Sequence, residues 1–328
     1  MPAPNRRPPW SLRGVADAAL WVGLAASFGL CLLTLAAFVG ETHWLLEITT
    51  HFRPHYAAGL LACVAVHALA RRFRLAAVFA VFALLNATVL APRFAPRTTA
   101  PASAGAPGIK LLLANVLTSN RDHAALIALV EHEQPDVIAL LEVNDEWLTA
   151  LAPLALTHPH ARRVPRSDNF GIALFSRLPL TDIKTVYLGP AEVPSISATF
   201  TRAGQSIRLL ATHPLPPGSA EGLLLRDQQL AAIALWSTAS STPALVIGDL
   251  NCTPWSPAFR RLLKDGALHD TGKGLNPTWP VAPKWLRIPL DHCLATRSLF
   301  VRDHHIGPDI GSDHFPLLVT VALPPASP

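Results

Sequence analysis

The sequence predicts a mixed-sheet α/β sandwich preceded by an all-α transmembrane anchor. The chain has 328 residues, of which half are apolar and 15% are charged, but these residues are unevenly distributed. Residues 1–94 consist mainly of long apolar runs, whereas residues 109–323 alternate short apolar runs with turn signals and helical patterns. Residues 95–108 lie between them and are rich in Pro, Ala, Ser and Thr, which is typical of a linker.

The anchor is expected to contain three membrane spans, at about residues 15–40, 55–70 and 75–91. The first is uncharged from Ala18 to Gly40, which is enough helix to cross a bilayer at about 1.5 Å per residue. It is too long for a signal peptide, and two further apolar runs follow it. Because those two runs are short, a single span with an interfacial or re-entrant hairpin is the alternative.

The arginines predict how the spans are oriented. Residues 1–107 carry nine Lys or Arg and three Asp or Glu. One arginine cluster, at residues 6–13, precedes the first span, and another, at residues 71–74, follows the second, whereas the segment 41–53 between these spans has two Glu and one Arg. With three spans, both clusters face the cytoplasm, although Arg93 and Arg97 mildly oppose this. The C-terminal domain then lies on the non-cytoplasmic side of a multi-pass protein, in a membrane that we expect to be a bacterial-type inner membrane.

The same count weakens any argument from charge for nucleic-acid binding. Of the 27 basic and 22 acidic residues, residues 108–328 carry 18 and 19, so the basic excess belongs to the anchor. Tight binding of a duplex rests largely on Lys and Arg that neutralise phosphates. The C-terminal domain has no such excess.

The C-terminal domain is expected to contain nine buried strands and few helices. Asp122 caps a helix that runs to about Glu133, and further helices are expected at residues 221–237 and 257–263. The first two strands and the helix between them form a β-α-β unit. The strands are expected at residues 109–114, 137–141, 171–176, 183–187, 195–200, 207–213, 244–248, 290–295 and 317–321.

Polar side chains gather where these apolar runs begin or end. A single carboxylate beyond a strand is more often a solvated loop residue or a helix cap. Several in one domain predict an active site along one edge of the sheets. These residues are Asn115, Glu142, His213, Asp249, Asn251, Asp291, Asp313 and His314.

In this order, the residues resemble the endonuclease/exonuclease/phosphatase superfamily, which includes DNase I, exonuclease III-type AP endonucleases, neutral sphingomyelinases and inositol polyphosphate 5-phosphatases. The most specific elements are Gly-Asp-Leu-Asn at residues 248–251 and Ser-Asp-His-Phe-Pro at residues 312–316. The strand that ends in Ser176-Arg177 is also similar. The resemblance covers about residues 108–323 and implies a DNase I-like fold and metal-dependent hydrolysis of phosphoesters.

The chemistry of phosphoester hydrolysis fits these positions. Glu142 is the best hard-oxygen ligand for Mg²⁺ or Mn²⁺, and the resemblance adds Asn115 and Asp313 as metal ligands. Asp249 would orient and deprotonate the attacking water, and Asn251 would hold water or a phosphoryl oxygen.

Histidines complete the expected site. His314, paired with Asp291, would meet the phosphate, because the carboxylate fixes the tautomer and favours the charged ring. His213 would donate to another phosphoryl oxygen. His292 is left out, because strand alternation points it away from Asp291. Seven other histidines of the domain lack a partner pattern and are expected at the surface: His123, His132, His158, His160, His269, His304 and His305.

Several other features leave alternatives open. Arg226 and Gln229 match an Arg-x-x-Gln pattern that is seen in relatives. They could equally lie on a solvated face of the helix at residues 221–237. Arg162, Arg163 and Arg166 are expected in a solvated loop. Residues Cys252 and Cys293 lie beside the motifs and could pair, whereas the chain has no Cys or His spacing typical of zinc.

The sequence therefore predicts a divalent-metal-dependent hydrolase of phosphoesters, tethered to the lipid bilayer by its N-terminal helices. The alternative is a catalytically inactive, membrane-tethered binding domain of the same fold. The substrate stays open between nucleic acid, a phospholipid headgroup and a small phosphoester. No protein partner is predicted.

Overall fold

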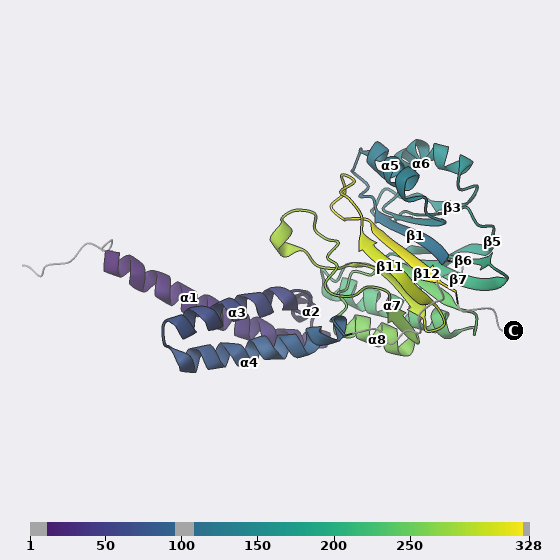
Figure 1. Cartoon of the computed structure of the whole chain (residues 1–328). Coiled ribbons are helices and arrows are strands. Elements are labelled where there is room, and N and C mark those ends of the chain that lie inside the picture. Colours follow the sequence, from purple (N-terminus) through teal and green to yellow (C-terminus); the bar gives the residue numbers. More distant parts are fainter. Residues whose placement is uncertain (1–11, 96–107, 324–328) are drawn as a thin grey trace, which may run out of the picture.

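The computed structural model describes residues 12–95 and 108–323 and consists of a helical bundle that projects from an α/β domain (Figure 1). Most of the predicted linker, residues 96–107, lies outside the described residues. The bundle contains α1 (Leu12–Ala36), the 3-10 helix η1 (Ala37–Thr42), α2 (Trp44–His51), α3 (Arg53–Leu69), α4 (Phe73–Leu90) and the 3-10 turn η2 (Ala91–Arg93).

Two stretches of the bundle, Trp21–Thr42 and Phe73–Arg93, are long and apolar enough to cross a membrane. These correspond to the first and third predicted spans. Helix α3 corresponds to the second and has 17 residues, which is at the lower limit for a span. Helix α2 was not expected: it lies in the segment between the first two predicted spans, at the end of the bundle next to the α/β domain (Figure 1).

The α/β domain contains two six-stranded mixed sheets, which confirms the predicted mixed-sheet sandwich. The first sheet has the order β11 (Phe300–Ile306), β12 (Leu317–Ala322), β1 (Gly108–Asn115), β2 (Val137–Leu141), β4 (Ile172–Ser176) and β3 (His160–Val164). The second has the order β5 (Leu180–Tyr187), β6 (Pro194–Arg202), β7 (Gln205–Ala211), β8 (Ala244–Asp249), β10 (Asp291–Thr296) and β9 (Leu268–Asp270).

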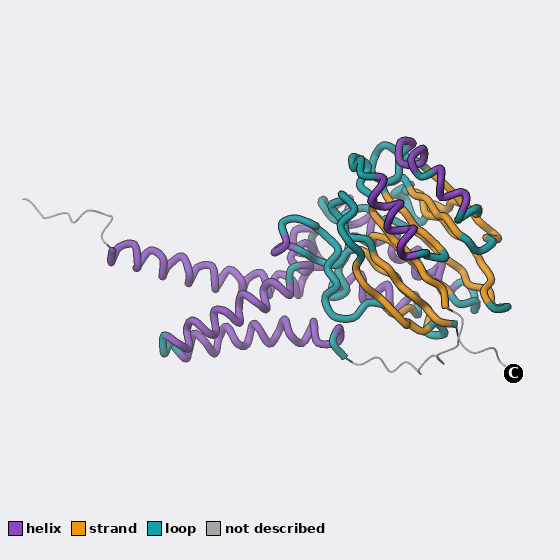
Figure 2. The backbone as a smooth tube through the Cα atoms, turned by 45° about the horizontal axis from the view of Figure 1, so that its top comes forward, coloured by secondary structure: helices purple, strands orange, loops and turns teal. Residues whose placement is uncertain are grey.

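Strand alternation explains how the sheets are covered. In β1, Ile109, Leu111 and Leu113 belong to the core between the two sheets, whereas Leu112 and Ala114 belong to a second core against helices. Figure 2 shows the helices on the outer faces of the sheets. Helices α5 (His123–Glu133) and α6 (Asp145–Ala150) cover the first sheet, and α7 (Ala220–Thr238) and α8 (Pro257–Asp265) cover the second.

All nine predicted strands are present, and the structure adds β3, β9 and β11. Each of these three lies at the edge of its sheet. Strands β3 and β11 are only partly buried and β9 has only three residues, so none of them contains the apolar run on which the prediction relied. For example, β11 reads Phe-Val-Arg-Asp-His-His-Ile. The expectation that Arg162 and Arg163 lie in a loop was therefore wrong, because both belong to β3.

The sheet topology brings the predicted site residues to one end of the sandwich. Strands β1 and β2 are parallel, as are β7 and β8, and a helix connects each pair. The polar residues that follow these strands therefore lie at their carboxyl ends. Strands β12 and β10 run antiparallel to β1 and β8, so the residues that begin them lie at the same edges.

Candidate active site

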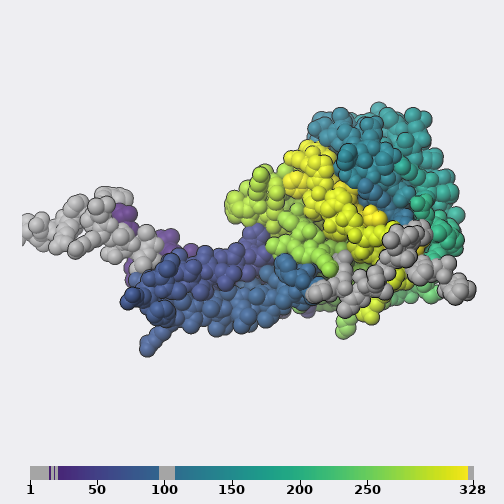
Figure 3. Space-filling model, viewed as in Figure 1, coloured from purple at the N-terminus to yellow at the C-terminus, as the bar shows by residue number. Residues whose placement is uncertain are grey.

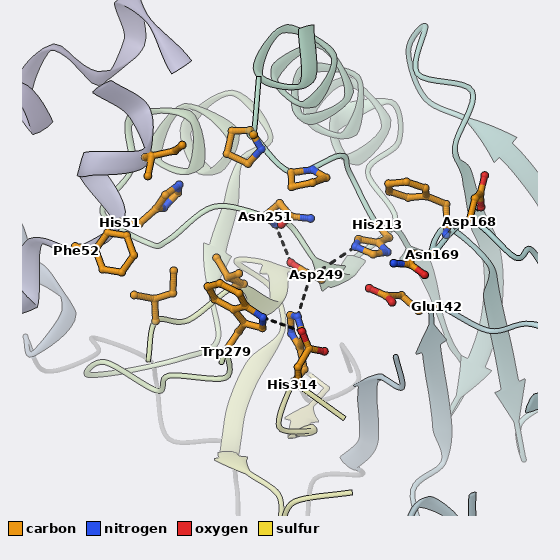
Figure 4. A pocket seen from close by; sticks show the side chains of 18 residues that line it. His51, Phe52, Glu142, Asp168, Asn169, His213, Asp249, Asn251, Trp279 and His314 are labelled. Atoms are coloured by element: carbon orange, nitrogen blue, oxygen red, sulfur yellow. Dashed lines mark hydrogen bonds and ion pairs between the residues drawn. The ribbon is translucent and has the colours of Figure 1, made fainter. Parts of the chain in front are cut away.

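The polar residues at the strand ends line a cavity of about 520 Å³ (Figure 4). From the first sheet come Glu142, Asp313 and His314, and from the second come His213, Asp249 and Asn251. Asn115 and Asp291 support these residues from beneath through hydrogen bonds. The structure thus brings all eight predicted site residues together.

Asn115 and Glu142 form a buried pair at the ends of the parallel strands β1 and β2. The amide Nδ2 of Asn115 donates to Glu142 Oε1 at 2.9 Å, and the backbone N–H of Leu117 donates to the amide oxygen at 3.2 Å. Burial raises the pKa of Glu142, although the hydrogen bond from Asn115 lowers it. A cation beside Glu142 would offset the cost of burying this carboxylate.

Asp313 lines the cavity from the turn before β12. The indole Nε1 of Trp279 donates to its Oδ2 at 3.0 Å, whereas its buried Oδ1 has no hydrogen-bond partner among the described residues. The hydroxyl of Ser312 donates to the backbone oxygen of Asn115 at 2.7 Å and so ties this turn to β1. An unpartnered buried carboxylate oxygen near Glu142 fits a hard cation.

Asp249 and Asp291 lie directly opposite each other in the antiparallel pair β8–β10. Burial, and then the charge of Asp291, raise the pKa of Asp249 well above its usual range. Asp291 differs because His314 Nδ1 lies 2.8 Å from its Oδ2. Although burial opposes it, the adjacent imidazole holds the pKa of Asp291 below its usual range.

The two histidines flank Asp249 but have opposite electrostatics. The Nε2 atoms of His213 and His314 each lie 3.6 Å from Asp249 Oδ2. Burial lowers the pKa of His213 to about 4, and its buried Nδ1 has no partner within the described residues. Burial would also lower the pKa of His314, but Asp291 raises it instead. The cavity therefore combines a neutral imidazole and a charged one.

Two glycines allow the strand ends to approach closely. A Cβ at Gly248 would lie 1.9 Å from the carbonyl oxygen of Thr212, and one at Gly171 would lie 1.8 Å from that of Val143. Neither position can carry a side chain without moving backbone. This explains the glycine of the Gly-Asp-Leu-Asn motif, because β8 must pack against the residues that precede His213.

Backbone conformation also marks this region. Glu142, Asn169 and Asn251 all line the cavity and have φ of 62°, 67° and 48°. Left-handed backbone is costly for residues with a Cβ, and such residues cluster at functional sites. The amide of Asn251 donates to Pro214 O at 2.9 Å, and its backbone N–H donates to Asp249 Oδ1 at 2.9 Å, which holds the strained turn.

Arg226 and Gln229 are fully buried, so the solvated helix face that the sequence also allowed is wrong for both. Arg226 Nη1 donates to the backbone oxygen of Asn251 at 3.1 Å, and Gln229 Nε2 donates to Thr212 Oγ1 at 3.2 Å. Both therefore support the residues beneath the cavity. The signal was their spacing of three on one helix face, which the apolar pattern alone did not assign.

Other expectations are also corrected. His158 is fully buried, and its Nε2 donates to Pro135 O at 2.9 Å, so it is not a surface residue. Cys252 and Cys293 are buried free cysteines. His292 donates to Cys252 O at 2.9 Å and takes no part in the cavity lining, in agreement with the alternation argument.

The helix α2 contributes residues that the sequence did not indicate. Ile48, His51 and Phe52 line the same cavity as Asp249 and His314 (Figure 4). Glu47, the residue before Ile48, accepts a hydrogen bond from Arg226 Nη2 at 2.9 Å. No motif marks these residues, because their place in the site depends on how the bundle packs against the domain.

The acidic and imidazole groups also contain a second arrangement that could hold a metal. Ligand atoms of Asp249, Asp291 and His314 all lie within 4.8 Å of one another. However, Asp291 and His314 already bond to each other at 2.8 Å. The Glu142 side offers only oxygen and amide groups, which suits Mg²⁺ or Mn²⁺ better.

The fold and this cavity define a class of protein, an α/β sandwich whose carboxylates and histidines meet at one end of two mixed sheets. Residues 112–314 match the model of the Endonuclease/Exonuclease/phosphatase family, and the chain belongs to that family. Its members are typically phosphoester hydrolases. No curated protein matches the chain closely enough to count as a relative.

Solved structures are similar in fold. An endonuclease/exonuclease/phosphatase from Beutenbergia cavernae is 20% identical, covers 66% of this chain and 72% of its own, and has a TM-score of 0.56. The human Nocturnin catalytic domain with bound sulfate is 19% identical, with 66% and 95% covered and a TM-score of 0.56. TDP2 of D. rerio with a single-strand DNA product is 14% identical, with 65% and 98% covered and a TM-score of 0.54.

Proposed function

We propose that this protein is a divalent-metal-dependent phosphoester hydrolase tethered to a membrane. The observation that carries the proposal is the convergence of Glu142 and Asp313 with Asp249 and His314 in one cavity. Hydrolysis of a phosphoester requires groups that neutralise charge, activate water and stabilise the leaving oxygen. This cavity offers a group for each task.

Glu142, Asn115 and Asp313 are the proposed ligands of Mg²⁺ or Mn²⁺. The unpartnered Oδ1 of Asp313 and the burial of Glu142 support this assignment. The second lone pair of the Asn115 amide oxygen is available for a cation. When bound, the ion would supply positive charge against the phosphoryl oxygens.

On the other side of the cavity, Asp249 is the proposed base. Its raised pKa suits a group that accepts a proton from water, and Asn251 holds it in place through the backbone N–H. Charged His314, fixed by Asp291, would bind a phosphoryl oxygen, and neutral His213 would donate a second hydrogen bond. The proton that Asp249 accepts leaves with the alcohol product.

Tethering through the bundle is part of the proposal. The two apolar stretches Trp21–Thr42 and Phe73–Arg93 support it, as do exposed apolar side chains such as Leu69, which is 86% exposed. The exposed cluster at residues 71–74, with three Arg, lies at the turn between α3 and α4, at the end of this helix pair that points away from the α/β domain (Figure 1). The positive-inside rule then favours a cytoplasmic tip and a catalytic domain on the opposite side.

A direct test uses full-length protein in detergent with bis(p-nitrophenyl) phosphate and either Mg²⁺ or Mn²⁺. We expect hydrolysis that EDTA abolishes and that Asp249→Ala and His314→Ala each reduce at least about 100-fold. If wild-type protein and both variants were equally inactive with every metal, the inactive binding domain would be the better description.

A further inference from the structure

One wall of the candidate active site comes from outside the family's matched region. Ile48, His51 and Phe52 lie at the end of α2, whereas the family match begins at residue 112. Figure 4 shows His51 and Phe52 across the cavity from His213 and Glu142. The wall therefore cannot be inherited from the family fold and is a property of this chain.

The contact that holds α2 in place is buried. Glu47 is 1% exposed and Arg226 is 0% exposed, and they form an ion pair at 2.9 Å. His51 Nδ1 lies 3.3 Å from Thr253 Oγ1, and the indole Nε1 of Trp255 donates to His51 O at 3.1 Å. Buried polar groups with specific partners fix one geometry, so α2 is a permanent part of the cavity.

The chemistry of this wall is apolar. Of the described residues, none that line the cavity is Lys or Arg. A nucleic-acid backbone would require several such side chains for its successive phosphates. A single phosphoryl group at the catalytic residues, joined to an apolar moiety, fits better. The apolar lining residues include Ile48, Phe52, Pro216, Pro217, Ile288 and Leu290.

The loop between β9 and β10 places the wall close to the bundle's apolar surface. It contains the 3-10 turn η4 (Lys284–Leu286), and Ile288 and Leu290 from the same loop line the cavity. Figure 3 shows this part of the α/β domain on the side that faces the bundle. Trp285 is 72% exposed, and its backbone bonds to the imidazole of His55 in α3. An exposed Trp beside the end of an apolar helix is typical of a membrane–water interface.

We propose that the substrate is a phosphoester of a membrane lipid, whose apolar portion lies against Ile48 and Phe52 while its phosphoryl group reaches Asp249 and His314. The inference rests on the proposed function and deepens it by naming the substrate class. Water oxygen forms the new P–O bond, the P–O bond to the lipid or headgroup alcohol breaks, and that alcohol oxygen takes up the proton.

The test compares lipids with the same headgroups lacking acyl chains, using full-length protein with Mg²⁺. Phosphatidylglycerol, phosphatidylethanolamine and phosphatidic acid in mixed micelles are each paired with their deacylated counterparts. A single-stranded oligonucleotide and bis(p-nitrophenyl) phosphate are assayed in parallel. We expect kcat/KM for at least one lipid to exceed that of its deacylated counterpart by about 100-fold, because acyl methylenes leave water.

Variants of the wall give a second readout. Ile48→Asn is expected to raise KM for that lipid about tenfold and to raise KM for its deacylated counterpart much less, so that the preference for the lipid falls. Leu45→Asn is the matched control, because Leu45 lies on the same helix, is 53% exposed and does not line the cavity. Leu45→Asn should leave KM unchanged for both the lipid and its deacylated counterpart.

The outcomes separate the two proposals. If the deacylated compounds or the oligonucleotide were cleaved as fast as every lipid, the lipid inference would be wrong while the hydrolase would stand. Equal KM values for Ile48→Asn and Leu45→Asn on the preferred lipid would also overturn it. If nothing were cleaved, bis(p-nitrophenyl) phosphate included, the proposed function itself would fail.

Discussion

The cavity has a polar floor and an apolar wall, and the two are built in different ways. The floor consists of the eight strand-end residues from Asn115 to His314, all within the α/β domain. The wall consists of Ile48 and Phe52 from α2, together with apolar residues of two loops. The floor follows from sheet topology, whereas the wall exists only because the helical bundle packs against the domain.

This difference separates the reaction from the choice of substrate. A phosphoryl group of any origin requires the same cation, base and imidazolium, so changes in the floor should affect every substrate. The wall touches only the part of a substrate that does not react. Changes there should therefore depend on how apolar that part is.

Asp249→Asn should have the largest effect, because it removes the proposed base and nearly preserves shape. We expect kcat to fall about 1000-fold on lipid and soluble substrates alike. Thermal stability should change little, since burial and the charge of Asp291 disfavour the Asp249 carboxylate and offset its attraction to His314. Steady-state kinetics check the loss of kcat, and thermal unfolding checks the stability. Asp265→Asn is the control, because Asp265 is an exposed residue at the end of α8. A substrate-dependent loss would argue against a common floor.

Glu47→Ala removes the buried ion pair between Glu47 of α2 and Arg226 of α7, which holds the wall against the α/β domain. It leaves the buried Arg226 with Asp227 as its remaining acidic partner, so we expect a loss of about 3 kcal/mol in unfolding free energy. Glu41→Ala is the matched control. Its ion pair with Arg261 is about half exposed, so its loss should stay below about 1 kcal/mol. Both losses are measured by thermal unfolding in detergent. Equal losses for the two variants would show that the buried Glu47–Arg226 pair stabilises the protein no more than an exposed ion pair does.

Glu142→Gln tests the metal side of the floor. Removing one carboxylate charge should raise the Mg²⁺ concentration for half-maximal activity at least about tenfold, and saturating Mg²⁺ should restore part of the rate. Activity measured across a Mg²⁺ titration checks this, and Glu146→Gln on an exposed side chain is the control. If the Mg²⁺ concentration for half-maximal activity were unchanged, Glu142 would not be a metal ligand.

His51 gives the smallest predicted effect, a dependence of stability on pH. Burial, and then the nearby charge of Arg226, lower its pKa from 6.5 to about 3. The unfolded state therefore binds the proton more readily. Stability is complete above pH 6.5 and falls as pH drops toward 3, by up to about 1.4 kcal/mol per pH unit.

His51→Asn should remove the contribution of His51 to the slope of unfolding free energy against pH. His213, whose pKa is also lowered, should still contribute to that slope. The charged group that acts on His51 is Arg226, which is itself paired with Glu47. Unfolding measured between pH 7 and pH 5 checks the slope. His43→Asn is the control, because His43 is exposed and caps α2, a role that Asn fills well. Identical slopes for the two variants would contradict the assignment.

The floor of the cavity could be predicted from the sequence and the wall could not, for a physical reason. Strands such as β2 and β8 are buried on both faces, so their apolar runs stand out, and the polar residue that ends each run is visible. The edge strands β3 and β11 were missed because they are only partly buried, and β9 was missed because its three residues are too few to form such a run. The floor residues could therefore be named, together with the sandwich.

The wall could not be predicted in the same way. Ile48 and Phe52 are apolar residues beside apolar spans, and nothing in their spacing distinguishes a cavity wall from a lipid-facing surface. The burial of Glu47 and Arg226 depends on a contact across 179 positions of sequence. Local patterns carry no information about such a contact, so Arg226 could not be separated from a solvated helix face.

The most direct test of this account is to locate the metal in crystals of the full-length protein soaked with Mn²⁺ and phosphate, using anomalous scattering. The account predicts one Mn²⁺ peak between Glu142 and Asp313, with phosphate oxygens near His213 and His314. A metal held instead by Asp249, Asp291 and His314, or no peak at any of these residues, would contradict the division of roles within the floor.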